Sequence, residues 1–261
     1  MSKAITKHKE DTKQAGETHL QGLASICSTL VIGLFVLTFV FQNFVIPSAS
    51  MASTLLVGDH VVVERATLSP SSSSSSFLPY KALRRGEPVV FYKPVADFDG
   101  KYSILVKRVI GLPGDRIHLR HGIVYLNGIA QNEPQTAKPT YANYDPYRDD
   151  FPSISPSGRR NVTAQWSLDL PTHIQGEDLI VPADSYFVMG DNRTDSLDGR
   201  YWGFVSRNNL IGRPLFVYWS FELPDDQMYK TTLSDRASFT LHEFVHFFDE
   251  TRWSRTFHRI E

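Results

Sequence analysis

The sequence predicts a mainly β domain that is attached to one N-terminal transmembrane helix and followed by a C-terminal helix. Three observations support this fold class: an uncharged apolar run near the N-terminus, a series of short β-branched and aromatic segments after it, and one amphipathic segment near the C-terminus. With 261 residues and a hydrophobic content of 41%, the chain can bury one substantial core. We therefore expect one main globular domain.

The apolar run is long enough to span a bilayer. Residues 23–41 carry no charge, and at about 1.5 Å of rise per residue a helix of this length crosses a hydrocarbon core of roughly 30 Å. A cleaved secretory signal peptide is the alternative, but its apolar core would be shorter. No lysine or arginine follows the run until Arg65, whereas four lysines precede it: Lys3, Lys7, Lys9 and Lys13. The positive-inside rule then predicts a cytoplasmic N-terminus and an extracytoplasmic remainder.

Seven segments beyond the anchor are predicted to be strands, because β-branched and aromatic residues dominate them. They are His60–Glu64, Pro88–Tyr92, Ser103–Ile110, Arg116–Leu119, Gly122–Gly128, Ser185–Asp191 and Pro214–Phe221. Two stretches are predicted to be surface loops instead: the serine run 69–76, and residues 131–175, which are rich in Pro, Tyr, Asn and Asp and form an inserted lobe.

The C-terminal segment 235–248 is predicted to be an amphipathic helix that covers the β-core. Its apolar stripe falls at i, i+3, i+4 and i+7, and comprises Leu241, Phe244, Val245 and Phe248. Trp253 and Phe257 are expected to extend this cover. The predicted organisation is thus a tail at 1–21, an anchor at 22–44, a catalytic domain at 45–224 and a helical segment at 225–261.

A serine just after the anchor and a lysine in a predicted strand are the first candidates for chemistry. Ser50 lies in the small-residue segment 47–59 at the expected lipid surface, and a serine hydroxyl needs a base to become a nucleophile. Lys107 shares a strand face with Leu105 and Val109, and such aliphatic neighbours would desolvate the amine and favour its neutral form. The alternatives are a polar stop to the membrane span and a lysine whose head reaches water.

A third block, MGDNRTDSLDGRYWGFV, gathers charged and polar residues into one turn-rich stretch at 189–205. A hydroxyl such as that of Ser196 could hold neutral Lys107 by a hydrogen bond. The alternative is a solvated loop whose surface ion pairs contribute little.

These blocks together resemble the bacterial type I signal peptidase (leader peptidase) family. PSASM with TLLVGDHVVVER, then VKRVIGLPGDRI, then GDNRTDSLDGRYWGFV follow one another in this order behind an anchor, and RRGEPVVFYKP is similar to the strand that leads toward the lysine block. The resemblance covers most of the region from about Val45 to Tyr218. It implies a signal-peptidase-like β-fold and a serine endopeptidase that removes N-terminal signal peptides from exported pre-proteins.

The resemblance also implies the role of each site residue. Ser50 would be the nucleophile and Lys107 the general base, while the Ser48 hydroxyl would join the Ser50 N–H in the oxyanion hole and Ser196 would orient the lysine. Four charged residues would pair around the site: Asp191, Asp198, Arg108 and Arg200. Met51 would help to shape the substrate pocket. No cofactor or metal is implied.

Three positions depart from the family pattern. Ser53 stands where proline is usual, Ala49 where glycine is common, and Gly199 where serine is usual. These changes alter the turn around the nucleophile but remove no reacting atom.

A second motif favours a different chemistry. His242, Glu243 and His246 match H-E-x-x-H, in which two histidines one turn apart bind zinc and the glutamate is the base of a metalloprotease. Asp249 and Arg252 stand where the longer form of this motif needs glycine and histidine. Because the histidines flank the apolar stripe, an ordinary amphipathic helix is the favoured interpretation, and no metal site is predicted.

Two further alternatives each explain only one feature of the sequence: the first explains the membrane anchor, and the second explains the Ser/Lys chemistry. A non-catalytic anchored binding domain would leave the ordered blocks unexplained, and a self-cleaving repressor-type protein would need a DNA-binding helix pair before the domain. The net charge of −1 argues against nucleic acid as a partner. The expected partners are signal-peptide-bearing pre-proteins and the lipid bilayer, for a monomer in the bacterial cytoplasmic membrane.

Overall fold

The computed structural model describes residues 19–68, 81–223 and 232–260. The chain divides into two units, residues 1–38 and residues 39–261. Two predictions rest on residues that lie outside the described ranges. The predicted orientation in the membrane depends on the lysine-bearing tail, and the predicted surface loop at 69–76 is the serine run.

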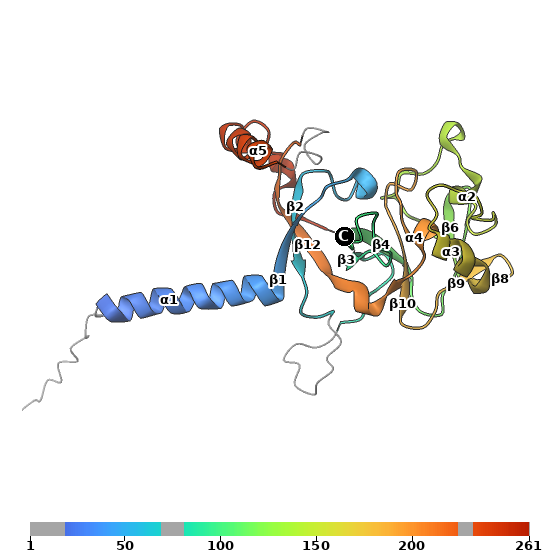
Figure 1. Cartoon of the computed structure of the whole chain (residues 1–261), viewed down its shortest axis with the longest axis horizontal. Coiled ribbons are helices and arrows are strands. Elements are labelled where there is room, and N and C mark those ends of the chain that lie inside the picture. The colour runs from blue at the N-terminus through green and yellow to red at the C-terminus, as the bar shows by residue number, and fades with distance from the viewer. Residues whose placement is uncertain (1–18, 69–80, 224–231, 261) are drawn as a thin grey trace, which may run out of the picture. The chain divides into compact units, whose positions relative to one another are not determined.

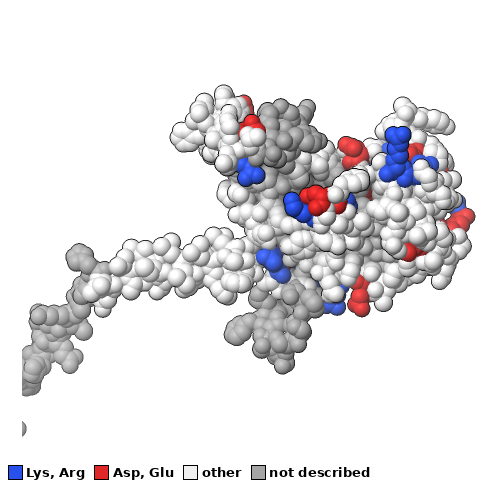
Figure 2. Space-filling view, viewed as in Figure 1, with Lys and Arg blue, Asp and Glu red and all other residues white. Residues whose placement is uncertain are grey.

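The first unit is dominated by one apolar helix. Helix α1 spans His19–Phe35, and wider helical turns continue it through Val36–Val40. Residues Leu20–Val40 form the one helix among the described residues that is long and apolar enough to cross a membrane, and its surface is free of charge along its length (Figure 2). The predicted anchor extended to residue 44, but the helix ends at Val40. The next five residues pair with another strand instead.

The second unit contains two antiparallel sheets (Figure 1). The larger has eight strands in the order β1-β2-β12-β3-β4-β10-β11, with β13 paired to β12, and the smaller has the order β7-β6-β5-β9-β8. Figure 1 shows the smaller sheet with α2 and α3 at one end of this unit and α5 at the other. The long strand β12 lies between β2 and β3 and joins the two halves of the larger sheet.

The larger sheet consists of β1 (Phe41–Val45), β2 (Asp59–Glu64), β3 (Pro88–Tyr92), β4 (Ile104–Gly111), β10 (Ser185–Met189), β11 (Val205–Ser206), β12 (Leu210–Ser220) and β13 (His258–Arg259). The smaller consists of β5 (Arg116–Arg120), β6 (Ile123–Leu126), β7 (Ile129–Ala130), β8 (Ile174–Gln175) and β9 (Asp178–Ile180). The helices of this unit are α2 (Pro146–Asp149), α3 (Ala164–Asp169), α4 (Gly199–Trp202) and α5 (Leu233–Val245).

All seven predicted strands are present, so the mainly β fold is confirmed. The alternation is clearest in β2, where every second side chain from Asp59 onward is buried. The strands that the sequence did not predict are short, apart from β1. Strand β1 pairs with β2 along its whole length, from Phe41 opposite Glu64 to Val45 opposite His60, and this pairing ends the helical conformation of the anchor.

The inserted lobe is not only a surface loop, as the sequence suggested. It contributes four buried side chains to the core around the smaller sheet: Tyr147, Phe151, Trp166 and Leu170. The Tyr147 hydroxyl and the Trp166 indole N–H both donate to the carbonyl oxygen of Arg200, at 2.5 and 3.0 Å. Because these aromatic residues are spread among Pro, Asn and Asp, they leave no periodic signal in the sequence.

The C-terminal helix forms, but its apolar stripe faces outward. The four stripe residues are exposed by 63 to 82%, and Trp253 and Phe257 are also exposed. The neighbouring helix face turns inward instead, where Phe239 and His242 contact the Phe221 ring at the end of β12. The prediction that the stripe covers the β-core is therefore wrong, because helical periodicity identifies an apolar face but not what it contacts.

These packing assignments predict that truncating two different phenylalanines has very different effects on stability. Phe151→Ala removes a fully buried ring from the lobe and should lower the free energy of unfolding by about 3–5 kcal/mol. Phe244→Ala truncates a ring that is 82% exposed and should leave that free energy almost unchanged. All four tryptophans lie between residues 166 and 253, so their fluorescence during denaturation of the full chain in detergent measures both. Equal losses would contradict the assignment of the lobe to the core.

Candidate active site

The turn between β1 and β2 carries two of the predicted site residues. Ala49–Met51 form one 3₁₀ turn that begins after Ser48, and the Ala52 N–H closes it by donating to the Ala49 carbonyl at 2.9 Å. The Ser48 and Ser50 hydroxyl oxygens lie 3.4 Å apart. The short turn therefore presents two hydroxyl groups side by side.

Strand β4 places Lys107 against this turn. The Lys107 Nζ lies 2.5 Å from the Ser50 Oγ, although 57 residues separate the two in sequence. The lysine is held in register by β3, where Val89 pairs with it. The arrangement joins a potential nucleophile to a potential base by one hydrogen bond.

The lysine amine is removed from water. Lys107 is 3% exposed, and burial is the largest cause that lowers its pKa from 10.5 to about 8. The carboxylates of Asp198 and Asp191 act in the opposite direction, and the Arg200 guanidinium adds to the lowering. The lysine therefore has a substantial neutral fraction near pH 8.

Arg108, next to the lysine, forms a buried ion pair with Asp191. Its Nε and Nη2 atoms each donate to one carboxylate oxygen at 2.7 Å, and both residues are almost fully buried. Thr54 bridges them, because its hydroxyl donates to Asp191 at 2.5 Å and accepts from Arg108 at 3.1 Å. This contact ties the segment after Ser50 to β4, and Thr54 was not singled out from the sequence.

Asp198 and Arg200 form a second buried pair. The guanidinium donates from Nε and Nη2 to the two carboxylate oxygens at 2.9 and 2.8 Å. Burial alone would raise the pKa of Asp198, but the Arg200 charge and its hydrogen bonds hold that pKa below its ordinary value. The same carboxylate accepts from the Gly190 N–H at 3.0 Å, so the pair also fixes the chain that leads from β10.

Gly190 begins the GDN segment, residues 190–192, at the point where this segment meets the turn that carries Ser50. A Cβ atom there would be 2.4 Å from the Ser50 carbonyl oxygen and 2.3 Å from the Ser196 Oγ, so only glycine fits this approach. Asn192 holds the other side of the turn, because its backbone N–H donates to the Ser50 carbonyl at 3.1 Å and its side-chain amide donates to the Ala49 carbonyl at 3.3 Å. Gly190 and Asn192 both lie in the polar block at 189–205. Because Gly190 has no side chain, nothing in the sequence indicated its close approach to Ser50.

The hydroxyl of Ser196 is buried near this contact. Ser196 is 7% exposed, and its Oγ has no hydrogen-bond partner among the described residues. The predicted hydrogen bond to Lys107 is therefore not formed in this conformation.

An apolar groove leads to the Ser50–Lys107 pair. It is lined by residues of β1 to β4 and of the turn that carries Ser50: Phe44, Val45, Ile46, Pro47, Ser48, Ser50, Val61, Val90, Ile104, Leu105, Val106 and Lys107. Met51 is fully buried in the core with Ile46, Val61 and Val90. Met51 therefore packs in the core against residues that line the groove, but it does not line the groove itself.

Two departures from the family pattern have a structural basis. Ser53 adopts a φ of +86°, which proline cannot reach because its ring fixes φ near −65°. A Cβ atom on Gly199 would lie 2.8 Å from the Val188 carbonyl oxygen and 2.9 Å from the Phe187 ring. A serine would not fit there without a shift of the backbone, so glycine suits this packing.

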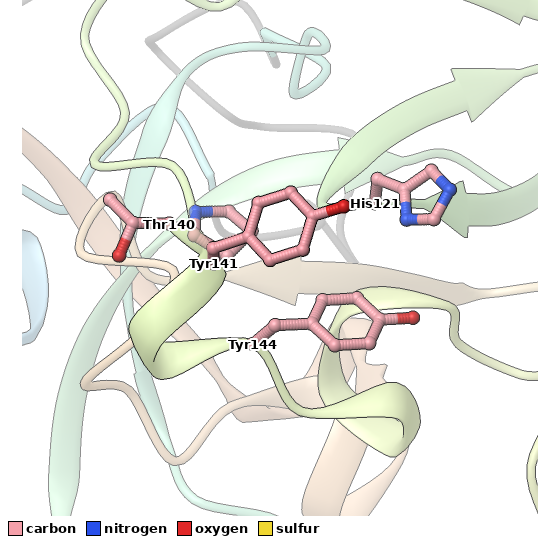
Figure 3. A pocket seen from close by; sticks show the side chains of 5 residues that line it. His121, Thr140, Tyr141 and Tyr144 are labelled. Atoms are coloured by element: carbon pink, nitrogen blue, oxygen red, sulfur yellow. The ribbon is translucent and has the colours of Figure 1, made fainter.

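Two other features lie apart from the groove. One pocket, between the tip of the β5–β6 hairpin and the lobe, is lined by His121, Pro139, Thr140, Tyr141 and Tyr144, and the two tyrosine rings lie one above the other beside the histidine (Figure 3). The other is a group that could hold a metal ion, and among the described residues it comprises His242, His246 and Glu250. None of these residues lines the groove.

The buried ion pair predicts a large loss of stability when it is broken. Arg108→Met leaves the fully buried Asp191 carboxylate without its partner and should lower the free energy of unfolding by about 3–5 kcal/mol. Lys101→Met breaks an exposed pair with Asp99 instead and should leave the unfolding midpoint unchanged. Denaturation of the full chain in detergent, followed by tryptophan fluorescence, compares them. A midpoint shift for Lys101→Met as large as that for Arg108→Met would contradict the account.

The chain is similar to known proteins over most of its length. Residues 20–219 match the family model described as "Signal peptidase, peptidase S26". A signal peptidase I of Leptolyngbya laminosa is 33% identical over 203 residues, which are 77% of this chain and 79% of that protein. A probable signal peptidase I-2 of Synechocystis sp. is 30% identical over 216 residues, covering 82% and 78% of the two chains.

Among solved structures, a signal peptidase I of Enterococcus faecalis is 30% identical, with a TM-score of 0.32, and the match covers 51% of this chain and 97% of that one. The sequence matches extend from the anchor through the Ser50 turn, the Lys107 strand and the GDN segment. The chain therefore belongs to the signal peptidase family, peptidase S26, and is a serine peptidase that removes signal peptides.

Proposed function

We propose that the protein is a membrane-bound endopeptidase that cleaves signal peptides from exported pre-proteins through a Ser50–Lys107 dyad. The observation that carries this proposal is the 2.5 Å separation between the Lys107 Nζ and the Ser50 Oγ. Within that contact the lysine is buried, and its pKa is lowered to about 8. A neutral amine within hydrogen-bond reach of a hydroxyl is the requirement for general-base activation of serine.

The reaction begins when neutral Lys107 accepts the proton of Ser50 as the hydroxyl oxygen attacks the scissile carbonyl. The resulting tetrahedral oxyanion collapses to an acyl-enzyme, and the Lys107 ammonium donates its proton to the departing amine. Neutral Lys107 then removes a proton from a water molecule, which attacks the acyl group and restores the Ser50 hydroxyl. One amine therefore acts as base and acid in turn, and its own protonation state is unchanged at the end of the cycle.

The oxyanion is assigned to two donors on the nucleophile turn. The Ser50 backbone N–H is one, and the Ser48 hydroxyl is proposed as the other because it lies 3.4 Å from the Ser50 Oγ. A preorganised donor of this kind contributes roughly 3 to 4 kcal/mol to transition-state stabilisation. The Asn192 hydrogen bonds to the carbonyl oxygens of Ser50 and Ala49 hold the turn that carries both groups.

Ser196 is proposed as a positioning residue for the lysine. Its hydroxyl is buried and unsatisfied within the described part of the chain, a state that carries a free-energy cost. A rotation of this side chain toward Lys107 would satisfy the hydroxyl and hold the amine when Ser50 is acylated. Asp191 with Arg108, and Asp198 with Arg200, are proposed to support the site through their buried ion pairs.

The groove supports cleavage after small apolar residues. Its wall is aliphatic and includes Ile46, Val61, Val90 and Val106, and Lys107 is the one charged side chain among the described residues that line it. The resemblance to the family implies alanine at the first and third positions before the cut, and an apolar groove suits such side chains. Met51 supports the groove from the core beneath.

We further propose that the chain crosses the bacterial cytoplasmic membrane once, with its catalytic unit outside and as a monomer. The apolar span Leu20–Val40 supports a single crossing, and the lysines that precede it support a cytoplasmic N-terminus. A zinc metalloprotease is the less favoured function. The family match ends at residue 219, before the H-E-x-x-H motif begins at His242.

Loss of either dyad side chain should abolish cleavage. Ser50→Ala removes the nucleophile and Lys107→Ala removes the base, and each is expected to lower kcat by at least about 10⁴-fold. The measurement is the cleavage of an exported precursor by the full chain in detergent. Ser153→Ala and Lys101→Ala, which change an exposed serine and an exposed lysine, serve as matched controls and should cleave at the normal rate. Substantial cleavage by either dyad variant would disprove the assignment.

The pH dependence of cleavage should follow the lysine. Because the neutral amine is the active form and its pKa is about 8, kcat/KM should fall about tenfold for each pH unit below 8 and level off above it. Initial rates on one precursor between pH 5 and pH 10 test this expectation. A rate that continues to rise toward pH 10.5 would mean that the amine is hydrated and that burial does not prepare it for catalysis.

A further inference from the structure

The end of α5 and the turn after it bring two histidines and one glutamate together. The His246 N–H donates to the His242 carbonyl at 2.8 Å, and the Glu250 N–H donates to the His246 carbonyl at 3.0 Å. This four-residue spacing places the three side chains on one side of the segment. One donor atom from each lies within 4.8 Å of the other two.

The side chains of this group contact one another directly. The His242 Nε2 lies 2.7 Å from the Glu250 Oε2, and the centroids of the two imidazole rings are 4.5 Å apart. Donor atoms around tetrahedral zinc are separated by about 3.4 Å, because each bond is near 2.0–2.1 Å. Small side-chain rotations therefore bring all three groups to coordination distance.

The surroundings of the group suit a metal. The side chains of His242, His246 and Glu250 are 30 to 39% exposed, so they are restrained by packing and still open to solvent. Asp249 contacts the His246 Nδ1 at 2.9 Å, and a carboxylate on this nitrogen orients the imidazole and leaves its Nε2 to bind the metal. Two imidazoles and one carboxylate form a donor set that zinc accepts, with water as the fourth ligand.

We propose that His242, His246 and Glu250 form a structural site for Zn²⁺ or a similar divalent transition metal. The segment around Glu250 is already joined to the end of β12. The Glu222 N–H donates to the Glu250 carbonyl at 3.1 Å, and the Arg252 N–H donates to the Ser220 carbonyl at 2.8 Å. A bound metal would therefore fasten the C-terminal end of α5 to the end of β12 in the larger sheet.

This site is distinct from a metalloprotease centre. The carboxylate that completes the group is Glu250, which lies four residues after the motif, whereas Glu243 is not part of the group. The sequence predicted no metal here because Asp249 and Arg252 do not continue the longer motif and the histidines flank the apolar stripe. The proposed metal fixes the helix and takes no part in cleavage at Ser50, so the proposal does not depend on the dyad mechanism.

Titration of the full chain with Zn²⁺ tests the site. The protein is purified in detergent without a histidine tag, and calorimetry should detect one equivalent of bound Zn²⁺. His242→Gln and Glu250→Gln should each lower the affinity by at least about tenfold, because even the loss of a group that only supports a ligand typically costs this much. His118→Gln is the matched control, since His118 contacts Asp178 at 2.6 Å but belongs to no such group among the described residues.

The outcomes separate the alternatives. Hydrogen exchange of the α5 amides should slow on addition of Zn²⁺ in the native chain, and in the His118→Gln variant, but not in Glu250→Gln. Precursor cleavage should be unaffected by a chelator. The proposal is overturned if no stoichiometric binding occurs, if binding survives both ligand variants, or if a chelator abolishes cleavage. Glu250→Gln keeps the shape of the side chain, so it decides the matter if His242→Gln fails to fold.

Discussion

The proposed chemistry depends on one constraint, which is that the Lys107 amine must stay out of water beside the Ser50 hydroxyl. Burial is the largest influence on the pKa of Lys107, and it outweighs the two carboxylates that favour the charged form. The β4 strand supplies the rigid position, and the apolar residues of the groove supply the dry wall. A base of this kind needs no histidine and no metal, only a strand that cannot move its lysine to solvent.

We propose that the charged residues around Ser50 and Lys107 act as a scaffold. Arg108 with Asp191 and Arg200 with Asp198 are both buried ion pairs, and each also contacts a segment that reaches the Ser50 turn. Buried pairs add little net stability compared with apolar packing. They fix geometry, because breaking a pair leaves a buried charge without its partner. The scaffold thus holds two distant parts of the chain, the Ser50 turn and the GDN segment, in one arrangement.

The sequence predicted the strands well, because alternation is a local signal, and its ordered motifs identified two residues, Ser50 and Lys107, that the structure places 2.5 Å apart. It failed where the decisive interaction is long-range: the lobe at 131–175 contributes to the core through aromatic residues that are scattered in sequence, and the α5 stripe is exposed although its periodicity is typical of a buried face. Gly190 carries no chemical group, so its close approach to the Ser50 carbonyl has no sequence signal. The sequence did not group Glu250 with His242 and His246, because Glu250 lies beyond the H-E-x-x-H motif.

The central claim is that burial lowers the pKa of Lys107 while its amine contacts Ser50, and direct titration of its side chain tests this most closely. NMR of the full chain in detergent, with ¹³C at lysine Cε, gives the pKa of each lysine, and a Lys107→Met sample identifies the resonance. The account predicts a pKa of about 8 for Lys107. A Lys107 pKa near the free-lysine value of about 10.4 would show a hydrated ammonium and contradict the proposed mechanism.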